Sequence, residues 1–411
     1  MSRALPLPTR LRWPMPAVLA IGLVIAALAA LRFTGQDLDV YRSTGWALLA
    51  GRNPYTEGLD GTWLPCVYTP FSAILFVPIA LVGHTMAMFV VTAASLACLW
   101  FSIGRFIESV WADRDRSAQL ELQAFCCLVL LTTESVSQTL GFGQVNFFLM
   151  ALVIGDVARR KPSAWQGVGV GLATSFKLIP GIFIVYLLCT RRWRAATTAS
   201  ATFAATIVFG WIVMPAGSWS YWIDGLGTDP RHIGGTNSLV NGSLLGVLAR
   251  PLGYAAARPW WITLAVPLLL AGMWLAVTVR RRLGEIAGIA TVSFVALVVS
   301  PISWNHYWVW FTLPALYLGR RAWETRDRRA IALTVIWVLP FFVAPFRFID
   351  DDRWLGPNHT LVESMLGGVY VVWAVAGLVT LALWARRNCE IRWLGPQAPD
   401  NAMSPMTTLA R

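Results

Sequence analysis

Long apolar stretches that alternate with short arginine-rich clusters constrain this chain more than any other feature of its sequence. Hydrophobic residues make up 56% of its 411 residues, whereas charged residues make up only 13%. So few charged side chains cannot cover a water-soluble domain of this size. A run of about 20 apolar residues is long enough to cross the ~30 Å hydrocarbon core of a bilayer as a helix. The sequence therefore predicts an all-α, polytopic membrane protein.

The positions of the basic residues predict which loops face the cytoplasm. The net charge of +12 is spread over clusters between the apolar runs, which favours the positive-inside rule over a nucleic-acid partner. If every cluster is cytoplasmic, the chain has about twelve transmembrane helices and both termini lie inside. These spans are expected near residues 14–33, 84–104, 120–139, 143–158, 164–176, 178–190, 195–214, 260–279, 284–301, 307–319, 330–346 and 364–385.

One apolar run, at residues 71–83, does not fit this count. A full crossing there would invert every later loop, so we expect a re-entrant or surface-lying segment on the outer side, where protein can bury its backbone ends. Residues 1–390 are predicted to form a single membrane domain, and residues 391–411 a disordered cytoplasmic tail. The six cysteines show no metal-type spacing and are given no role.

The first outer segment reads "DLDVYRSTGWALLAGRNPY" from Asp37 to Tyr55. Asp37 has two interpretations, a helix cap or solvated loop acid, and a general base held at the membrane edge. The residues that follow have the apolar spacing of an amphipathic helix lying on the outer face. Asp39 is a second candidate acid, and Arg52 and Tyr55 belong to a polar turn that is a candidate binding surface.

Two further outer corners carry amides and a lysine. In "GFGQVNFFLM", Gln144 and Asn146 follow a glycine turn, and they are interpreted either as helix caps or as ligands for sugar hydroxyls and phosphate oxygens. In "ATSFKLIPG", Lys177 lies between two short apolar runs, and it is one of only two lysines, with Lys161. A lysine there is costly unless it reaches the outer headgroups or binds an anion such as phosphate.

Aromatic and amide side chains mark the last two outer segments. The stretch "SPISWNHYWVW" contains Trp304, Asn305, His306 and Tyr307. An aromatic belt explains tryptophan and tyrosine at an interface, but it does not explain the asparagine or the histidine. The long 215–259 loop is either an ordinary outer loop or part of a site for a polyol or glycan, with two asparagines as its candidate ligands, Asn237 and Asn241.

Six of these motifs, in this order and spacing, resemble glycosyltransferase family 87, which has the GT-C membrane fold. The resemblance covers roughly residues 14 to 385. It rests on "DLDVYRSTGWALLAGRNPY", "YTPFSAILFVPIAL", "GQVNFFLMAL", "FKLIPGIF", "NSLVNGSLLGVLARP" and "SPISWNHYWVW". The position of Asp37 matches the family's expected catalytic base. Where the family often has two successive histidines, this chain has His306 followed by Tyr307.

The resemblance implies an inverting α(1→2)-mannosyltransferase that acts at the periplasmic face of the plasma membrane. Its donor would be polyprenyl-phosphate-mannose, and its acceptor a phosphatidylinositol mannoside or lipomannan. Asp37 would accept the proton of the attacking hydroxyl, with His306 and Asp39 as further catalytic candidates. Lys177 and Arg52 would stabilise the leaving phosphate. We expect no metal, cofactor or obligatory protein partner.

Two other functions remain as alternatives. A lipid-linked sugar flippase needs polar residues spread through the spans on both sides of the midplane, whereas the polar residues here gather on the outer face. A GT-C transferase that uses a different polyprenyl-phosphate sugar would carry the same motifs. The sequence alone does not separate the donor sugars.

Overall fold

The computed structural model of the protein describes scattered positions from 17 to 28, and then residues 34–387 except 160, 162, 228 and 350–358. The expected span at 14–33 lies mostly outside the described residues, and the tail at 391–411 lies wholly outside them. In the described part, the β-type pairing is limited to one isolated bridge, between Asn241 and Trp304. The all-α fold class is confirmed.

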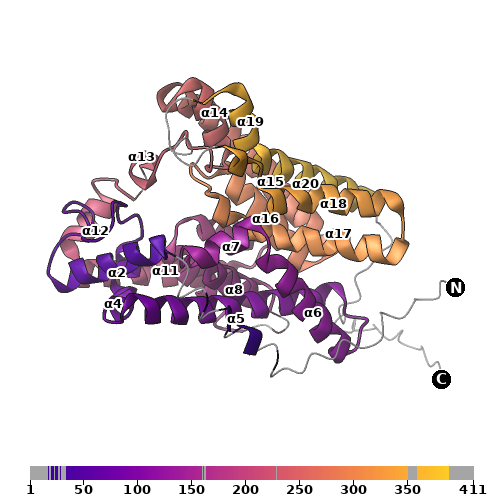
Figure 1. The fold of residues 1–411 in the computed structure, drawn as a ribbon, viewed down its shortest axis with the longest axis horizontal. Coiled ribbons are helices and arrows are strands. Elements are labelled where there is room, and N and C mark those ends of the chain that lie inside the picture. Colours follow the sequence, from indigo (N-terminus) through magenta and orange to yellow (C-terminus); the bar gives the residue numbers. More distant parts are fainter. Residues whose placement is uncertain are drawn as a thin grey trace, which may run out of the picture.

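Short and long helices are interspersed along the described part of the chain (Figure 1). The helices of the first half are α2 (Gln36–Leu49), α3 (Pro70–Leu75), α4 (Val77–Ala80), α5 (His84–Val110), α6 (Arg116–Leu131), α7 (Glu134–Gly141), α8 (Asn146–Val157), α9 (Val168–Phe176), η1 (Ile179–Gly181), α10 (Ile182–Cys189), α11 (Trp193–Val213) and α12 (Pro215–Trp222). Those of the second half are α13 (Pro230–Ile233), α14 (Leu244–Leu252), α15 (Tyr254–Leu283), α16 (Glu285–Val299), η2 (Asn305–Phe311), α17 (Thr312–Thr325), α18 (Arg328–Val343), η3 (Pro345–Phe348), α19 (Leu361–Gly367) and α20 (Val369–Arg387).

Three helices, α5, α11 and α15, are each long and apolar enough to cross a membrane. Two bent pairs pass the same test when each is taken together: α6 with α7, bent by 77°, and α19 with α20, bent by 50°. By length and composition, the described residues therefore contain three spans, or up to five if each bent pair is one span. The expected count of twelve is not confirmed, because several expected spans fold as shorter helices, such as α8 and α16.

Capping side chains explain why several helices begin where they do. Asp115 accepts a hydrogen bond from Ala118 N at the start of α6 (2.9 Å), and Ser243 accepts one from Gly246 N at the start of α14 (3.0 Å). Such caps satisfy backbone donors that have no partner inside the helix. Helix boundaries in this chain thus follow local sequence signals.

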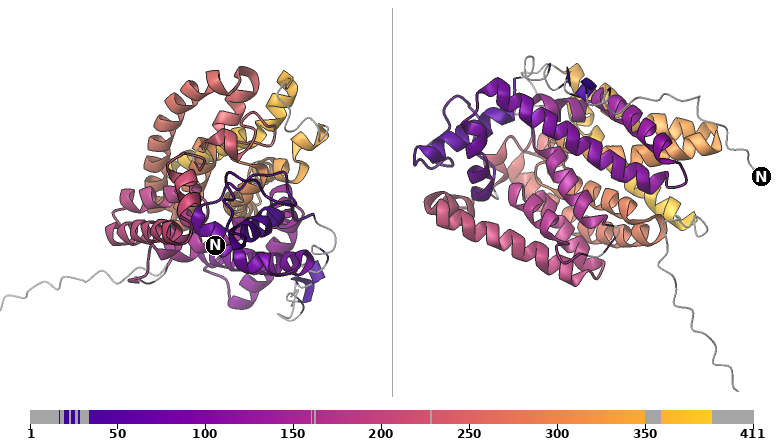
Figure 2. Two further views of the ribbon diagram at one scale, coloured as in Figure 1. Left: turned by 90° about the vertical axis from the view of Figure 1, so that its left-hand side faces the viewer. Right: turned by 90° about the horizontal axis from the view of Figure 1, so that it is seen from below.

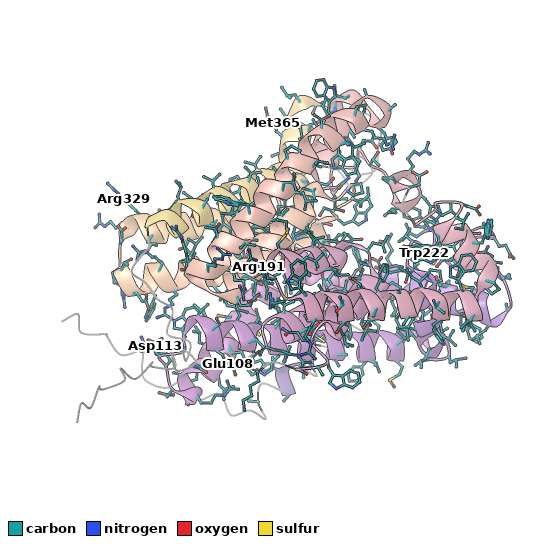
Figure 3. All side chains as sticks on the ribbon, turned by 180° about the vertical axis from the view of Figure 1, so that it is seen from behind. Glu108, Asp113, Arg191, Trp222, Arg329 and Met365 are labelled. Atoms are coloured by element: carbon teal, nitrogen blue, oxygen red, sulfur yellow. The ribbon has the colours of Figure 1, made fainter. Side chains whose placement is uncertain are left out.

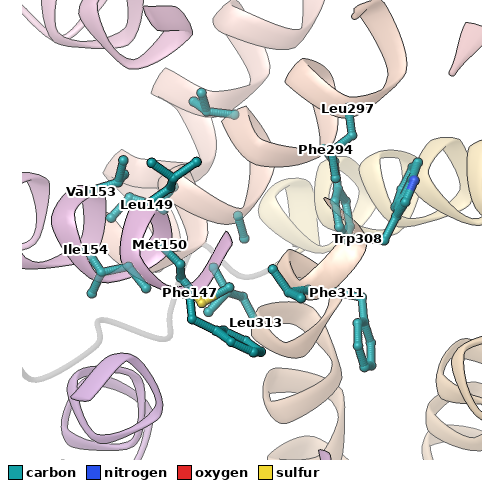
Figure 4. Packing of buried hydrophobic residues seen from close by; sticks show 14 of the residues in the cluster. Phe147, Leu149, Met150, Val153, Ile154, Phe294, Leu297, Trp308, Phe311 and Leu313 are labelled. Atoms are coloured by element: carbon teal, nitrogen blue, oxygen red, sulfur yellow. The ribbon is translucent and has the colours of Figure 1, made fainter. Parts of the chain in front are cut away.

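The core of the molecule lies around α8, α16 and η2 (Figure 4). Nearly every side chain of α16 is buried, as expected for a helix that is apolar on all sides. Phe147 and Met150 of α8, Phe294 of α16, and Trp308 and Phe311 of η2 are among its fully buried side chains. Because η2 packs against α7, α8, α16 and α17, it joins the two halves of the chain.

Helices α5, α8, α9 and α11 form a layered row. Each packs on the next, and the view from below shows α5 and α11 at its two sides (Figure 2). At Gly171 of α9, an added Cβ would lie 2.6 Å from the Ala199 carbonyl oxygen of α11, so the two backbones approach more closely than any larger residue allows. Small residues at such contacts are typical of helix packing in membranes.

Charged residues of α5, α18 and the loop after α5 lie at one end of the molecule. Figure 3 shows Glu108, Asp113 and Arg329 at the end opposite Trp222. Arg320 of α17 contacts Asp113, in the loop after α5, at 3.4 Å. The last turns of α17 and the loop after α5, both predicted to face the cytoplasm, are therefore neighbours in space.

The expected outer helix and the run at 71–83 both fold close to the predicted bounds. Helix α2 buries Leu38, Tyr41 and Ala47, but it also exposes the apolar Trp46 and Leu49, so its exposed face is not purely polar as an amphipathic helix predicts. The 71–83 run forms α3 and α4, whose combined range, Pro70–Ala80, spans about 16 Å at helical rise. That is too short for a full crossing of a ~30 Å hydrocarbon core.

Candidate active site

The 141–143 turn holds the first turn of α2. The backbone N–H groups of Asp37 and Leu38 both donate to the carbonyl oxygen of Phe142, at 3.1 and 3.0 Å. Gly143 makes this approach possible, because its φ is +69° and a Cβ there would lie 2.9 Å from Leu38 Cβ. The position of Asp37 is thus fixed by backbone contacts.

Gln144 lies at the centre of a buried polar cluster. Its carbonyl Oε1 accepts hydrogen bonds from Lys177 Nζ (2.9 Å), Tyr41 OH (3.2 Å) and Tyr68 OH (3.4 Å). The same side chain also acts on the Asp37 carboxylate, whose pKa it lowers. Because Oε1 is the side chain's only acceptor, the three donors fix its orientation. Gln144 therefore links a carboxylate to an ammonium group.

Lys177 lies, as predicted, in the break between two short apolar helices, α9 and η1. Besides its bond to Gln144, its Nζ lies 3.4 Å from Asn146 Oδ1. The ammonium group is 4.1 Å from the centre of the Tyr307 ring and 5.3 Å from that of Tyr68. Aromatic faces stabilise a cation at such distances. Amide oxygens and rings thus hold the charge at the edge of the cluster.

The last turn of α9, just before Lys177, is held by two hydroxyl groups of α3 and its cap. Thr69 Oγ1 donates to the carbonyl oxygen of Ser175. Ser72 Oγ lies within hydrogen-bond distance of the carbonyl oxygens of Ser175 and Phe176, at 3.2 Å in each case. Terminal carbonyls of a helix need partners outside it. These bonds fix the direction in which the chain leaves α9.

The electrostatic environment of Asp37 suits a base that works near neutral pH. Burial raises the pKa of its carboxyl from 3.8 to about 6, although the Lys177 charge and the Gln144 hydrogen bond both act to lower that pKa. A general base is most effective when its pKa lies near the working pH. The side chain remains partly accessible.

His306 of η2 reaches the same cluster. Its ring is 6% exposed, packs edge-on against Phe142 and Tyr307, and has no hydrogen-bond partner at either nitrogen within the described part of the chain. Its carbonyl oxygen accepts hydrogen bonds from Thr139 Oγ1 (2.9 Å) and Asn146 Nδ2 (2.8 Å). The backbone is thus fixed, while both imidazole nitrogens are buried without a hydrogen-bond partner among the described residues.

Asp39, the second predicted acid, faces a different set of groups. Its carboxylate contacts His84 Nδ1 at 2.8 Å and Arg42 at 3.8 Å. These contacts join α2 to the start of α5. Asp39 is therefore placed to hold α2 rather than to meet a substrate beside Asp37.

Two of the predicted binding residues in the first outer segment also lie outside the cluster. Arg52 forms an ion pair with Asp60 at the surface. Tyr55 is buried, and its hydroxyl donates to the Tyr68 carbonyl oxygen at 2.7 Å. Tyr55 therefore supports the backbone of Tyr68, whose hydroxyl belongs to the Gln144 cluster.

The asparagines of the 215–259 loop lie beside the "SPISW" segment. Asn241 is buried and binds the backbone on both sides, with its Oδ1 accepting from Ser303 N at 2.9 Å. Trp304 packs so closely on Gly234 that a Cβ there would be 2.6 Å from the indole ring. Asn237, which is partly buried, lies in the adjoining turn. Trp304 and Asn241 thus join residues 234–241 to the segment that precedes His306.

Three buried residues that contact the cluster or its supports were not predicted: Tyr41, Tyr68 and Glu134. Tyr41 follows Asp37 by four residues, which places both on one helix face, so its position was readable in the sequence. Glu134 is one of two acids in the predicted span at 120–139, with Glu121 at its start, and acids inside spans are functional candidates. Tyr68 gave no comparable signal.

Comparison with known proteins gives a consistent result. The sequence model of Glycosyltransferase family 87 matches residues 67–301. A polyprenol-phosphate-mannose-dependent alpha-(1-2)-phosphatidylinositol mannoside mannosyltransferase of Mycobacterium tuberculosis is 31% identical over 84% of each chain. A polyprenol-phosphate-mannose-dependent alpha-(1-2)-phosphatidylinositol pentamannoside mannosyltransferase of Mycolicibacterium smegmatis is 32% identical over 60% of this chain and 59% of its own length. No solved structure matches the chain.

Proposed function

The chain belongs to glycosyltransferase family 87, and from this we propose that it transfers mannose from polyprenyl-phosphate-mannose to the 2-hydroxyl of a mannose on a lipid-linked mannoside. The names of the similar mycobacterial enzymes support the donor, the α(1→2) linkage and a phosphatidylinositol mannoside acceptor. The observation that carries the proposal here is the cluster in which Lys177 donates to Gln144 and both residues act on the Asp37 carboxylate.

In this reaction Asp37 is the general base. The acceptor oxygen attacks the anomeric carbon of the donor, the bond from that carbon to the phosphate oxygen breaks, and the hydroxyl proton moves to the Asp37 carboxylate. Attack opposite the leaving group inverts the configuration from β to α. A base with a raised pKa holds this proton better than an exposed aspartate does.

Lys177 is proposed to bind the leaving phosphate. Negative charge grows on the phosphate oxygens as the sugar departs, and a fixed cation stabilises that charge more in the transition state than before it. Lysine suits this role because its ammonium is a compact point charge. The chain itself supplies the positive charge, so the proposed reaction uses no metal ion or cofactor.

His306 is proposed to contact the donor phosphate or the acceptor sugar through an imidazole nitrogen. Its burial beside Tyr307 and the absence of protein partners at both nitrogens, within the residues that the structure describes, support this role. A buried polar group without a partner is costly. A substrate oxygen would supply the missing hydrogen bond.

We also propose the GT-C architecture with about twelve spans, and an active site that faces the periplasm from the plasma membrane. The arginine-rich segment around Arg329 lies at the end of the molecule that also carries Asp113 (Figure 3), and the positive-inside rule favours the cytoplasm for such a segment. The donor, the acceptor and the bilayer are the proposed partners, and no protein partner is included.

The test is an incubation of membranes that contain the protein with labelled polyprenyl-phosphate-mannose and a set of phosphatidylinositol mannosides. The proposal predicts a labelled product with a new α(1→2)-linked mannose. Labelled polyprenyl-phosphate-arabinose in a parallel reaction tests the other donor class. Movement of the intact labelled donor across vesicle membranes without sugar transfer would instead identify a flippase and contradict the proposal.

A further inference from the structure

Glu134, the first residue of α7, is a buried carboxylate outside the Asp37 cluster. Its side chain is 1% exposed. One oxygen accepts a hydrogen bond from Asn305 Nδ2, and the other accepts bonds from Tyr370 OH at 2.9 Å and Ser135 Oγ at 3.4 Å. These donors come from α7, η2 and α20. A single acid thus connects three elements that are far apart in the sequence.

The bond to Asn305 fixes the start of η2. Asn305 N donates to the Val240 carbonyl oxygen at 3.1 Å, so both its backbone and its side chain are engaged. Further along α7, Thr139 Oγ1 donates to the His306 carbonyl oxygen at 2.9 Å. Helix α7 therefore holds two successive residues of η2, one through Glu134 and one through Thr139.

This support reaches the Gln144 cluster through Tyr307, the third residue of η2. Tyr307 follows Asn305 by two positions, and its ring lies 4.1 Å from Lys177 Nζ. Displacement of Asn305 would move the His306 and Tyr307 rings together, since η2 is a short, tight helix. The cation of the proposed phosphate site would then lose the aromatic face beside it.

A carboxylate is costly in a buried position unless several donors satisfy it. Glu134 has three such donors, because each carboxylate oxygen can accept more than one hydrogen bond. The exposed Arg347 also attracts its charge. The arrangement makes a strong, directional support for Asn305 and leaves no oxygen of Glu134 directed at the Asp37 cluster.

We propose that Glu134 is a positioning residue, which orients the Asn305, His306 and Tyr307 turn so that Lys177 and the His306 imidazole meet the donor. This inference rests on the proposed mannosyl transfer. It also assigns Asn305, a predicted substrate ligand, to support of the turn, because its side-chain amide is bound to Glu134 and not to the cluster.

A reciprocal exchange tests the inference on the purified full-length protein. Asn305→Asp places two carboxylates against each other in a buried site, so kcat/KM for the donor should fall at least about tenfold, the usual order for a disrupted buried network. Glu134→Gln can still accept from Asn305 and donate to the Tyr370 hydroxyl, so it should stay within about threefold of wild type. In the double variant the introduced glutamine amide would donate to the introduced carboxylate, and activity should return to within about threefold of wild type.

If Asn305 bound the substrate instead, the double variant would not recover its kcat/KM. If Glu134→Gln/Asn305→Asp remains as impaired as Asn305→Asp while its thermal unfolding temperature is restored, Asn305 acts on substrate and the inference is wrong. Tyr370→Phe is a milder variant for the case in which Asn305→Asp does not fold. It should raise the donor KM a few-fold, about the effect of one lost hydrogen bond, and an unchanged KM would contradict the inference.

Failure of the proposed function gives a different pattern. A wild-type protein that is folded and transfers no mannose to any acceptor would reject mannosyl transfer itself. Unfolding temperatures alone then test the contact between Glu134 and Asn305. Asn305→Asp should unfold at a lower temperature than wild type, and the double variant should unfold at the wild-type temperature. Equal destabilisation of both variants would overturn the Glu134 support as well.

Discussion

Asp37 differs from a surface aspartate because its burial favours the neutral acid, whereas Lys177 and Gln144 favour the carboxylate. With a pKa of about 6, the base is protonated and inactive below that pH. We predict that kcat/KM for the donor falls tenfold per pH unit below about 6, instead of below the ordinary aspartate value. The measurement is a pH profile of mannosyl transfer at donor concentrations well below KM. A rate that stays constant down to about pH 4.5, where most of such a base is protonated, would contradict the assignment.

Gln144 provides a matched variant for that profile. Its hydrogen bond lowers the pKa of Asp37, so Gln144→Met, which keeps the side-chain length without the amide, should move the inflection to higher pH. The direction of this change separates titration of Asp37 from titration of a group that Gln144 does not contact.

Lys177 is predicted to act on the donor and its departure. Lys177→Met should lower kcat/KM on the order of 10²-fold, as loss of one charge-stabilising group typically does, and Lys177→Arg should recover part of it. Steady-state kinetics against donor concentration measure both. The variant should remain folded, since removal of a partly buried charge lowers a desolvation cost. Wild-type kinetics in Lys177→Met would place the phosphate elsewhere.

At the scale of elements, the contact between α3 and the end of α9 determines where Lys177 emerges. Thr69→Val with Ser72→Ala removes the hydroxyl groups that bind the carbonyls of residues 175 and 176. We predict a donor KM raised about tenfold, because a lysine that loses its orientation loses part of its charge-assisted contact. Thr69→Ser with wild-type Ser72 keeps both hydroxyls and is the control. Equal KM values for the two variants would show that α9 needs no such support.

Much of the site was predictable from the sequence, and the reason is topological. Asp37, Gln144, Asn146, Lys177 and His306 were expected on one side of the membrane, and the structure brings them into one cluster. Arg52 and Asp39 were also expected on the outer side, but Arg52 pairs with Asp60 at the surface and Asp39 contacts His84 of α5. The predicted topology limits the candidate site residues to those on the outer side of the membrane. Which of these residues form the site depends on contacts between elements that are distant in the sequence. The Glu134 bond to Asn305 joins residues 171 positions apart, and no local pattern encodes it.

At the scale of the whole molecule, the twelve-span topology remains a prediction that accessibility can test. Gly83 and Gly319 both have open space where a Cβ would lie, so cysteine fits at either position. In a background without the six native cysteines, Gly83→Cys should react with a membrane-impermeant thiol reagent from outside. Gly319→Cys, next to an arginine cluster, should react only after the membrane is opened. Labelling of Gly83→Cys only from inside would refute the assigned orientation.

The central claim is that Asp37 is the base of a mannosyl transfer, and one comparison tests it most directly. Purified Asp37→Asn and Asp39→Asn differ by two positions on the same helix and change the same chemical group. With labelled polyprenyl-phosphate-mannose at saturation, Asp37→Asn should lose about 10²- to 10⁴-fold in kcat with donor binding retained. Asp39→Asn, whose partner is His84, should lose less than about tenfold, as for a disrupted surface ion pair. An Asp37→Asn enzyme that transfers mannose at a rate similar to wild type would contradict the claim.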